Sequence, residues 1–278
     1  VQSEQVRILR QGDDDRSRHA LTSSLHGLRR ANWANHLVVL MRVASAAAAK
    51  LVLGMKRGNR PLVIAYTKVV NEHPDNMRFL ADCERWFNYP ITIMSNLEYG
   101  GDIYEVFRRT RYLVGPDGAA CTRLLKKEVR KRYQRPDDVH VFGYTAEEQD
   151  RLDAFIDANN GVDVRAPLID RGLTKADCHA MVARAGIELP EMYRLGYRNN
   201  NCIGCVKGGA GYWNKIRKDF PETFERMAQV EGELGRTINV SRVGGVRKRI
   251  MLRELDPNAG NYEAEPSIDC GIACELAS

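Results

Sequence analysis

The chain between residues 37 and 66 reads LVVLMRVASAAAAKLVLGMKRGNRPLVIAY. It begins with the apolar run 37–41 and ends with a second run, 62–66, and both have the length and branched side chains of buried strands. Between them, Ser45 is a candidate N-cap for an alanine-rich helix over residues 46–56. A strand, a helix and a second buried strand in this order predict parallel pairing of the two strands.

The same alternation continues as far as residue 190. We expect further strands at 91–94, 139–142 and 167–169, and helices at 74–87, 103–111, 121–133 and 174–185, with another helix capped by Thr145 and Glu148. This pattern predicts an α/β fold with a doubly wound, mostly parallel sheet. The polar residues 1–35 are expected to form an N-terminal arm, and residues 36–190 the α/β domain. Residues 191–278 contain loops, glycines, cysteines and a helix near 219–234, and are expected to form a C-terminal, cysteine-containing appendage packed on that domain.

The composition excludes several classes of protein. The chain has 278 residues, of which 44% are hydrophobic and 28% charged, so it is neither collagen-like, wholly disordered nor a small disulfide framework. Its longest apolar stretch, residues 43–55, is shorter than the roughly 20 residues that a membrane helix needs, and it contains Lys50. Residues 1–18 are polar and charged, unlike a secretory signal. We therefore expect a cytoplasmic protein without a membrane partner.

The positive charge is concentrated in one part of the chain. The net charge is only +6, but residues 106–135 contain ten Lys and Arg and only two acids. Such a run is typical of a solvated helix face, and it is also compatible with an anionic ligand such as a nucleotide or a nucleic acid.

The seven cysteines fall into two groups. Cys83 and Cys178 stand singly in helix-like segments and are expected to be buried or inert. The others are Cys121 before the basic helix, a C-x-x-C at Cys202 and Cys205, and a C-x-x-x-C at Cys270 and Cys274. An odd number of cysteines in a reducing compartment favours metal or redox chemistry over disulfides.

An open parallel sheet binds ligands beyond the carboxyl ends of its strands. Four loops should meet there: 42–45, 67–75, 118–123 and 143–148. The first enters a helix whose N-terminal amides suit phosphate, and small residues at 44–49 permit close approach of the backbone. In the second, Glu72 and Asp75 are candidates for ribose or metal binding, although loop polarity alone explains them equally well.

These segments together resemble the phosphoadenosine phosphosulfate (PAPS) reductase family, within the PP-loop adenine-nucleotide α-hydrolases, and most of all its phage and prophage members. The resemblance covers roughly residues 36–275. It rests on YT at 66–67, NEHPDN at 71–76, RF at 78–79, CTR at 121–123, KK at 126–127, GYTAEE at 143–148, PLI at 167–169, NCIGCVK at 201–207 and DCGI at 269–272.

The resemblance implies that residues 36–190 bind an adenine nucleotide, either ATP or PAPS. It assigns nucleotide binding to Arg42, Ala44, Ser45, Tyr66, Glu72, Asp75, Arg123, Lys126 and Gly143. The chain departs from the family in two places. The family's Ser-Gly-Gly-x-x-Ser phosphate loop is matched only by Ser45 in the segment LMRVAS at 40–45, and Lys68 stands where the family favours an acid.

The resemblance also assigns roles to the cysteines. It implies a [4Fe–4S] cluster, or alternatively zinc, held by Cys121, Cys202, Cys205 and a tail cysteine, Cys274 or Cys270. Cys270, in the setting Asp269-Cys270-Gly271, resembles the catalytic nucleophile that attacks the sulfur of an adenylylated sulfate. The alternative is that Cys270 is the metal ligand and Cys274 is not.

Three hypotheses about function follow. The first is a PAPS-reductase-like enzyme of sulfur metabolism with an adenine nucleotide as substrate and a thiol- or electron-donor protein as partner. The second is an ATP-dependent PP-loop sulfurtransferase that modifies tRNA or DNA. The third is a non-catalytic family member with a degenerate phosphate loop. The family also suggests a homodimer.

Overall fold

The computed structural model describes residues 6–9, 37–40, 43–55, 61–116, 118–243 and 246–268. The fold is mixed α/β. Its main sheet has six strands in the order β1-β4-β3-β2-β7-β8, and every neighbouring pair is parallel except β1 with β4. The strands are β1 (Val6–Leu9), β2 (Leu37–Leu40), β3 (Leu62–Thr67), β4 (Ile91–Asn96), β7 (Val139–Val141) and β8 (Asp163–Arg165).

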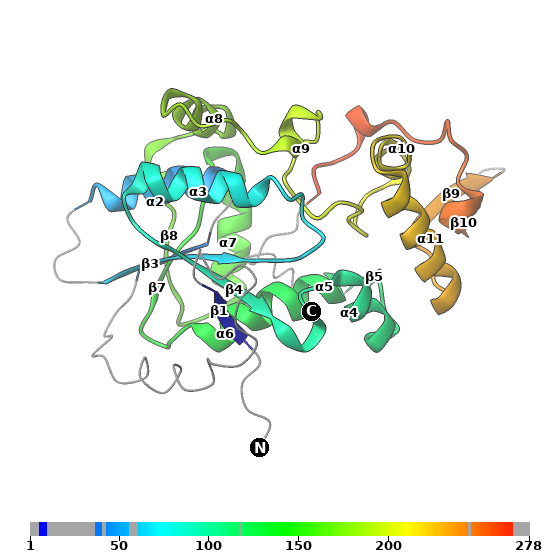
Figure 1. The fold of residues 1–278 in the computed structure, drawn as a ribbon, viewed down its shortest axis with the longest axis horizontal. Coiled ribbons are helices and arrows are strands. Elements are labelled where there is room, and N and C mark those ends of the chain that lie inside the picture. The colour runs from blue at the N-terminus through cyan, green and yellow to red at the C-terminus, as the bar shows by residue number, and fades with distance from the viewer. Residues whose placement is uncertain are drawn as a thin grey trace, which may run out of the picture.

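Helices pack on both faces of this sheet because its central strands are apolar on both sides. In β3, Ile64 lies in the hydrophobic cluster of α2 (Val43–Leu53), α3 (Asn76–Phe87) and α8 (Lys175–Arg184). The next residue, Ala65, belongs to the cluster of α6 (Glu128–Tyr133) and α7 (Gln149–Ala158) on the opposite face. Figure 1 shows α2 and α3 side by side across the first face. The unbroken apolar sequence of β3 is therefore explained by burial on both faces.

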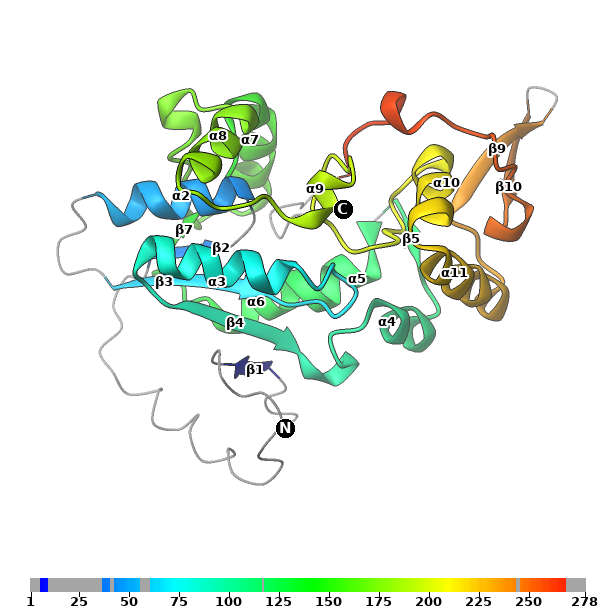
Figure 2. The same cartoon turned by 45° about the horizontal axis from the view of Figure 1, so that its top comes forward.

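A further hydrophobic cluster joins the C-terminal part of the chain to the middle part. Phe107 from α4 and Leu125 pack in one cluster with Trp213 from α10 and Met227 from α11, and all four are fully or almost fully buried. Figures 1 and 2 show α10 and α11 beyond the ends of β3 and β4, with a two-stranded hairpin at the far side. The elements concerned are α4 (Ile103–Thr110), β5 (Val114–Gly115), β6 (Gly118–Ala119), α5 (Ala120–Thr122), α9 (Glu191–Arg194), α10 (Ala210–Asp219), α11 (Pro221–Leu234), β9 (Asn239–Val243) and β10 (Val246–Ile250).

Most of the expected elements of the sheet part are confirmed to within a few residues. The helix start at Thr145 has the predicted capping box with Glu148. Two expectations were wrong. Helix α2 begins at Val43, so Ser45 lies inside its first turn and is not the N-cap. The last strand is β8 at 163–165, and residues 169–171 form a 3₁₀ turn instead.

Strand β1 and the hairpin of β9 and β10 are among the elements that were not expected. Residues 6–9, inside the segment interpreted as an arm, pair with β4 and add an antiparallel edge to the main sheet. Strands β9 (Asn239–Val243) and β10 (Val246–Ile250) pair antiparallel in the part of the chain after residue 190, where loops and one helix were expected. Among the helices in the described ranges, none combines the length and the apolar character needed to cross a bilayer.

A buried histidine in β7 makes the stability of this fold sensitive to pH. His140 is 1% exposed, and its Nδ1 has no hydrogen-bond partner among the described residues. Burial, and then the charge of Arg130, lower the pKa of His140 below its usual 6.5. Below pH 6.5 the unfolded chain therefore binds a proton that the folded chain does not, and the free energy of unfolding falls as the pH falls.

We expect the variant His140→Phe to lose this dependence, because phenylalanine does not titrate. Between pH 6.5 and 5, the free energy of unfolding of the wild type should decrease more steeply than that of the variant, by up to about 1.4 kcal/mol per pH unit. Urea denaturation at several pH values measures both slopes. Parallel curves for the two proteins would contradict the buried, neutral state of His140.

Candidate functional site

A pocket of about 800 Å³ lies at the edge of the sheet where the strand order reverses. From β2 the chain proceeds through β3 to β4 on one side, and β7 and β8 lie on the other. The pocket is lined by Val43, Ala44 and Ser45 after β2, by Tyr66 and Thr67 at the end of β3, and by residues 142–145 after β7. A reversal of this kind leaves a crevice beyond the carboxyl ends of the strands, where open α/β sheets bind their ligands.

The two sides of this crevice approach each other closely at Gly143. A Cβ atom at this position would lie 2.5 Å from the backbone nitrogen of Ser45 and 2.6 Å from its Cα. Only glycine fits here without displacing the first turn of α2. Because the first amides of a helix have no partner within the helix, the start of α2 provides donors and a positive dipole end at the pocket.

A buried ion pair forms part of the pocket wall. The Nζ of Lys126 lies 2.9 Å from Oε1 of Glu72, and each side chain is 6% exposed. The other carboxylate oxygen of Glu72 accepts hydrogen bonds from the Tyr66 hydroxyl and, at 3.2 Å, from the Asn76 amide. Burial, followed by the charge of Glu72, raises the pKa of Tyr66. Tyr66 therefore stays protonated and donates to Glu72 over the physiological pH range.

Lys126 reaches this position from an irregular helix. Residues 123–127 form a π-helical turn between α5 and α6. The side-chain amide of Asn96, at the end of β4, donates a 2.8 Å hydrogen bond to the carbonyl of Leu124 within that turn. Single π-helical turns inside α-helices occur frequently at functional sites. Here the turn places Lys126 against the pocket, whereas Arg123 in the same turn is 63% exposed and pairs with Glu128.

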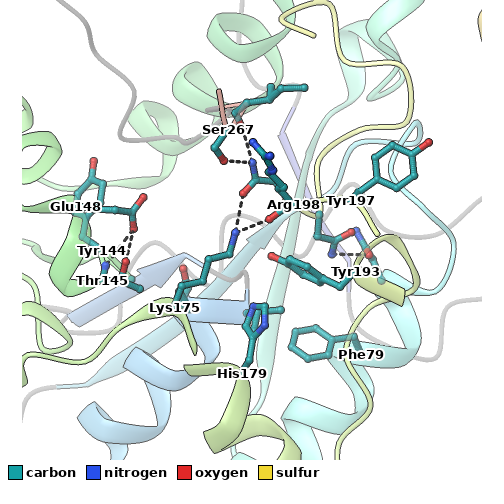
Figure 3. Close-up of a pocket in the computed structure, with 18 of the residues that line it drawn as sticks. Phe79, Tyr144, Thr145, Glu148, Lys175, His179, Tyr193, Tyr197, Arg198 and Ser267 are labelled. Atoms are coloured by element: carbon teal, nitrogen blue, oxygen red, sulfur yellow. Dashed lines mark hydrogen bonds between the residues drawn. The ribbon is translucent and has the colours of Figure 1, made fainter. Parts of the chain in front are cut away.

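The opposite wall comes from α8 and the segment that follows α9. The ammonium of Lys175 donates to the carbonyl of Arg198 and, at 3.2 Å, to the side-chain oxygen of Asn199. The ring of His179 lies 4.9 Å from that of Tyr193 in an edge-to-face arrangement. Burial and the nearby Lys175 lower the pKa of His179, so its imidazole is neutral at pH 7. Figure 3 shows these side chains around the pocket.

One side of the pocket is lined by Ser267 and Ile268, near the end of the described chain. Asn199 donates to the hydroxyl of Ser267 and to the carbonyl of Ile268, and Asn201 donates to the same carbonyl at 2.9 Å. Arg198 donates to the carbonyls of Glu263 and Glu265. Ser267 and Ile268 line the pocket, so the end of the described chain is tied to the site.

Three polar atoms at the pocket have no partner in the described part of the chain. They are the hydroxyl of Thr67, Nε2 of His179 and the side-chain oxygen of Asn200, and all three are buried. Thr67 as a whole is only 5% exposed. Buried polar groups are almost always hydrogen-bonded in native proteins. A polar ligand bound in this pocket would supply partners for these three atoms.

Six of the residues assigned to nucleotide binding line this pocket, namely Ala44, Ser45, Tyr66, Glu72, Lys126 and Gly143. Asp75 and Arg123 are not among its lining residues. Arg42 lies outside the described residues.

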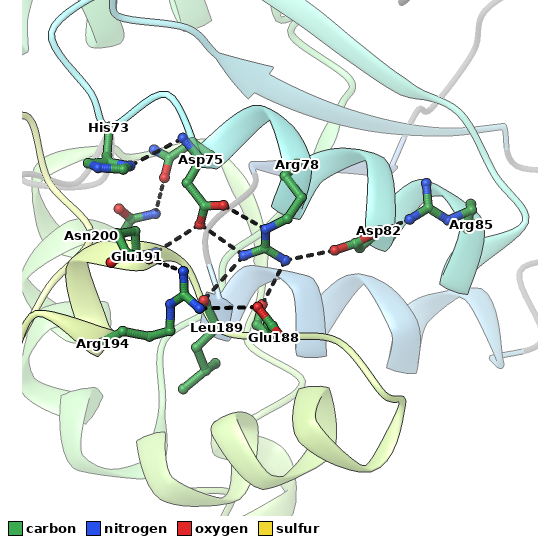
Figure 4. Close-up of polar contacts among 11 residues, drawn as sticks. His73, Asp75, Arg78, Asp82, Arg85, Glu188, Leu189, Glu191, Arg194 and Asn200 are labelled. Atoms are coloured by element: carbon green, nitrogen blue, oxygen red, sulfur yellow. Dashed lines mark hydrogen bonds and ion pairs between the residues drawn. The ribbon is translucent and has the colours of Figure 1, made fainter.

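Asp75 instead forms a clamp that joins α3 to the segment before α9. Its carboxylate accepts two hydrogen bonds from Arg78, at 2.6 and 2.9 Å, and one from the backbone of Glu191 at 2.8 Å. Arg78 also binds Asp82 and the carbonyls of residues 188 and 189. Hydrogen bonds from Arg78 are the largest cause of the lowered pKa of Asp75. Figure 4 shows this network. Asp75 therefore joins α3 to the start of α9 and does not line the pocket.

The C-x-x-C lies directly behind the pocket wall. Cys202 forms an isolated antiparallel bridge with Glu72, and the amide of Ile203 donates to the carbonyl of Asn71 at 2.9 Å. Cys202 and Cys205 are each 6% exposed and belong to one hydrophobic cluster, against which Cys121 also packs. The described residues contain no group of three or more metal-ligating side chains. Cys270 and Cys274, assigned to catalysis and metal binding, lie outside the described residues.

Cys83 and Cys178 are fully buried, as expected. Burial raises the pKa of Cys83 to about 12 and that of Cys178 to about 11, so both remain thiols at neutral pH.

Sequence analysis missed the wall formed by α8 and residues 193–200. Lys175, His179, Tyr193 and Asn200 follow neither a glycine-rich loop nor a strand end. Lys175 and His179 belong to α8, which packs on α2, and Tyr193 and Asn200 come from α9 and the segment after it. The one local signal was the capping box of Thr174 and Asp177, which fixes where α8 begins.

Searches of the sequence against protein-family models and against curated proteins give no match.

The buried ion pair predicts an asymmetric response to substitution. Lys126→Met leaves the carboxylate of Glu72 buried without its cation, and we expect it to lower the free energy of unfolding by about 3–5 kcal/mol. The double variant Glu72→Gln/Lys126→Met removes both charges and should recover a large part of this loss. Arg123→Gln breaks an exposed pair in the same turn and should cost less than about 1 kcal/mol. Urea denaturation measures all three, and equal losses for Lys126→Met and Arg123→Gln would refute the buried pair.

Proposed function

We propose that this pocket binds an adenine nucleotide and that the chain is a PAPS-reductase-like enzyme of sulfur metabolism that uses cysteine thiol chemistry. One observation carries the proposal: the pocket lies at the reversal of the strand order, directly against the first turn of α2. Its volume of about 800 Å³ is within the range of small-molecule and cofactor sites. The reversed strand order, with helices on both faces, also supports the doubly wound description of the sheet.

The start of α2 is the proposed phosphate site. The backbone amides of Ala44 and Ser45 and the hydroxyl of Ser45 supply hydrogen-bond donors, and the helix dipole favours negative charge there. Gly143 brings the opposite strand end against this turn without a side chain in the way. The lining residues therefore provide a phosphate site that does not depend on glycines at 41 and 42.

The nucleoside part is proposed to lie toward β3 and α8. Thr67 and Asn200 have unpartnered oxygens there, and the neutral His179 has an unpartnered ring nitrogen. Phe79 and Tyr193 add aromatic surface to the same wall. Hydrogen-bonding groups next to aromatic rings suit a purine base and a ribose.

The sulfur chemistry is proposed for Cys270, as the resemblance implies. Ile268 lines the pocket, and the two residues from Ile268 to Cys270 span at most about 7 Å. The Cys270 thiolate would attack the sulfur of the adenylylated sulfate, forming a sulfur–sulfur bond and breaking the bond from sulfur to the phosphate oxygen. The nucleotide leaves with that electron pair. A dithiol donor protein would then release sulfite from Cys270 and become oxidised to a disulfide.

A [4Fe–4S] cluster, or alternatively zinc, is proposed at Cys121, Cys202 and Cys205, with Cys274 as fourth ligand. The three described cysteines share one hydrophobic cluster, and four thiolates suit either group. Among the described residues, these three cysteines do not form a group that could hold a metal by themselves, so the proposed site requires the tail to bring its ligands together. The group would supply a rigid connection between the C-x-x-C and the tail.

Nucleotide binding can be tested with two matched threonines. Thr67 and Thr237 both have a buried hydroxyl without a partner among the described residues, but only Thr67 lines the pocket. Replacing either with valine removes an unsatisfied polar group and should leave the free energy of unfolding unchanged or higher. Thr67→Val should weaken binding of ATP or PAPS at least fivefold, whereas Thr237→Val should not change it.

Calorimetric titration of each protein with ATP, PAPS and, for comparison, GTP measures these affinities. Binding of adenine nucleotides that is unaffected by Thr67→Val would place the ligand elsewhere. No binding of either adenine nucleotide by the wild type would favour a non-catalytic protein.

The metal proposal predicts about four irons and four sulfides per chain after purification without oxygen, with absorbance near ~400 nm. Zinc without sulfide is the expected result for the alternative. Cys202→Ser should abolish the bound metal, and Cys178→Ser, a change at a buried cysteine in a different hydrophobic cluster from the C-x-x-C, should retain it. A wild-type protein without metal, or loss of metal in both variants, would overturn the assignment.

A further inference from the structure

The side-chain amide of Asn200 ends a chain of hydrogen bonds that begins at the buried ion pair. Its Nδ2 donates to Oδ1 of Asn76 at 2.8 Å (Figure 4), and Nδ2 of Asn76 donates to Oε2 of Glu72 at 3.2 Å. Asn200 lines the pocket, and its Oδ1 is buried without a partner in the described part of the chain. We propose that this oxygen selects the nucleotide by accepting a hydrogen bond from the exocyclic amino group of its base.

The direction of each hydrogen bond in this chain is set by Glu72. Its carboxylate is paired with Lys126 and has no hydrogen to donate, so it only accepts. The Tyr66 hydroxyl and the Asn76 amide both donate to its Oε2. Asn76 therefore turns its NH2 group to Glu72 and its oxygen to Asn200, because two oxygens 3.2 Å apart would repel each other.

The same reasoning fixes the orientation of Asn200. If its amide were turned end for end, two oxygens would face each other across the 2.8 Å that separates it from Asn76. The NH2 group of Asn200 therefore points to Asn76, and its oxygen remains as an acceptor. A buried acceptor without a donor is unfavourable, so a ligand that offers no hydrogen to this oxygen binds more weakly.

Of the three buried atoms at this pocket without a partner among the described residues, that of Asn200 has a fixed polarity. The other two are the hydroxyl of Thr67 and Nε2 of the neutral His179. A hydroxyl both donates and accepts, and a neutral imidazole nitrogen does either according to its tautomer. These two atoms adapt to a donor or to an acceptor on the ligand, whereas the oxygen of Asn200 does not.

The neighbouring aromatic rings favour a base over a ribose hydroxyl as the donor. Phe79 and Tyr193 line the pocket, and the ring of Tyr193 packs edge-to-face against His179 at 4.9 Å (Figure 3). A flat base fits beside such rings and presents its donors in its own plane. Adenine carries an amino group where hypoxanthine carries an oxygen. That oxygen would face the oxygen of Asn200, so the pocket should prefer ATP to inosine triphosphate.

Because this selection rests on the proposed nucleotide site, calorimetric titration of the full chain with three nucleotides tests the two separately. Inosine triphosphate replaces the amino group of ATP with oxygen, and 2′-deoxy-ATP lacks a ribose hydroxyl. The variant Asn200→Ala removes the acceptor, and Asn76→Ala allows the Asn200 amide to turn. The matched control Asn159→Ala changes an asparagine that does not line the pocket and donates to the Phe155 carbonyl at 2.8 Å.

We expect the wild type to bind ATP at least about tenfold more tightly than inosine triphosphate, and to bind 2′-deoxy-ATP within about threefold of ATP. Asn200→Ala should remove the preference by weakening the binding of ATP. Asn76→Ala should remove it by strengthening the binding of inosine triphosphate, because the Asn200 amide can then offer its NH2 group. A purely structural role of either side chain would weaken both nucleotides alike. Asn159→Ala should keep the wild-type preference.

Equal binding of ATP and inosine triphosphate by the wild type, or a preference retained by either pocket variant, would overturn the role of Asn200 and leave the proposed function standing. A loss of affinity for 2′-deoxy-ATP that disappears in Asn200→Ala would also overturn it, by assigning the oxygen to a ribose hydroxyl. If the wild type binds none of the three nucleotides, the proposed function is wrong and the selection by Asn200 is wrong with it.

Discussion

The close approach of two backbone segments at Gly143 and Ser45 determines where the pocket lies. A side chain at 143 would collide with the first turn of α2, since its Cβ would be 2.5 Å from the Ser45 nitrogen. This approach closes the crevice between β2 and β7 at its base, and the walls from β3 and α8 stand around it. The strand reversal brings these two segments together, and their contact places the pocket beside the start of α2.

The buried pair of Lys126 and Glu72 connects this pocket to the cysteine region. Glu72 lies in the loop after β3, Lys126 in the π-helical turn, and Cys202 bridges to Glu72 through the backbone. A buried ion pair adds little to stability compared with an apolar replacement, but loss of one partner is costly. Its effect here is to fix three segments in one arrangement beside the ligand, with Tyr66 as a permanent donor to the same carboxylate.

The sheet and half of the site could be predicted from local sequence, because apolar strands, caps and strand-end loops are local signals. The residues that sequence analysis misjudged depend on contacts between distant segments. The sequence could not distinguish the role of Asp75 from that of Glu72. Only the fold shows that Arg78 and the backbone amide of residue 191 donate hydrogen bonds to the Asp75 carboxylate. Arg123 lies in the same π-helical turn as Lys126 but faces solvent and pairs with Glu128, a difference that the sequence alone does not show. The hairpin at 239–250 does have a local signal, which is the Gly-Gly pair at 244–245 between Val243 and Val246.

Hydrogen–deuterium exchange with and without an adenine nucleotide tests the site at the strand reversal most directly. If the nucleotide binds there, the amides of residues 43–46 and 143–146 exchange more slowly when ATP or PAPS is present, and those of the hairpin at 239–250 do not change. If exchange at 43–46 and 143–146 is the same with and without saturating nucleotide, the start of α2 is not a phosphate site and the proposed function is wrong.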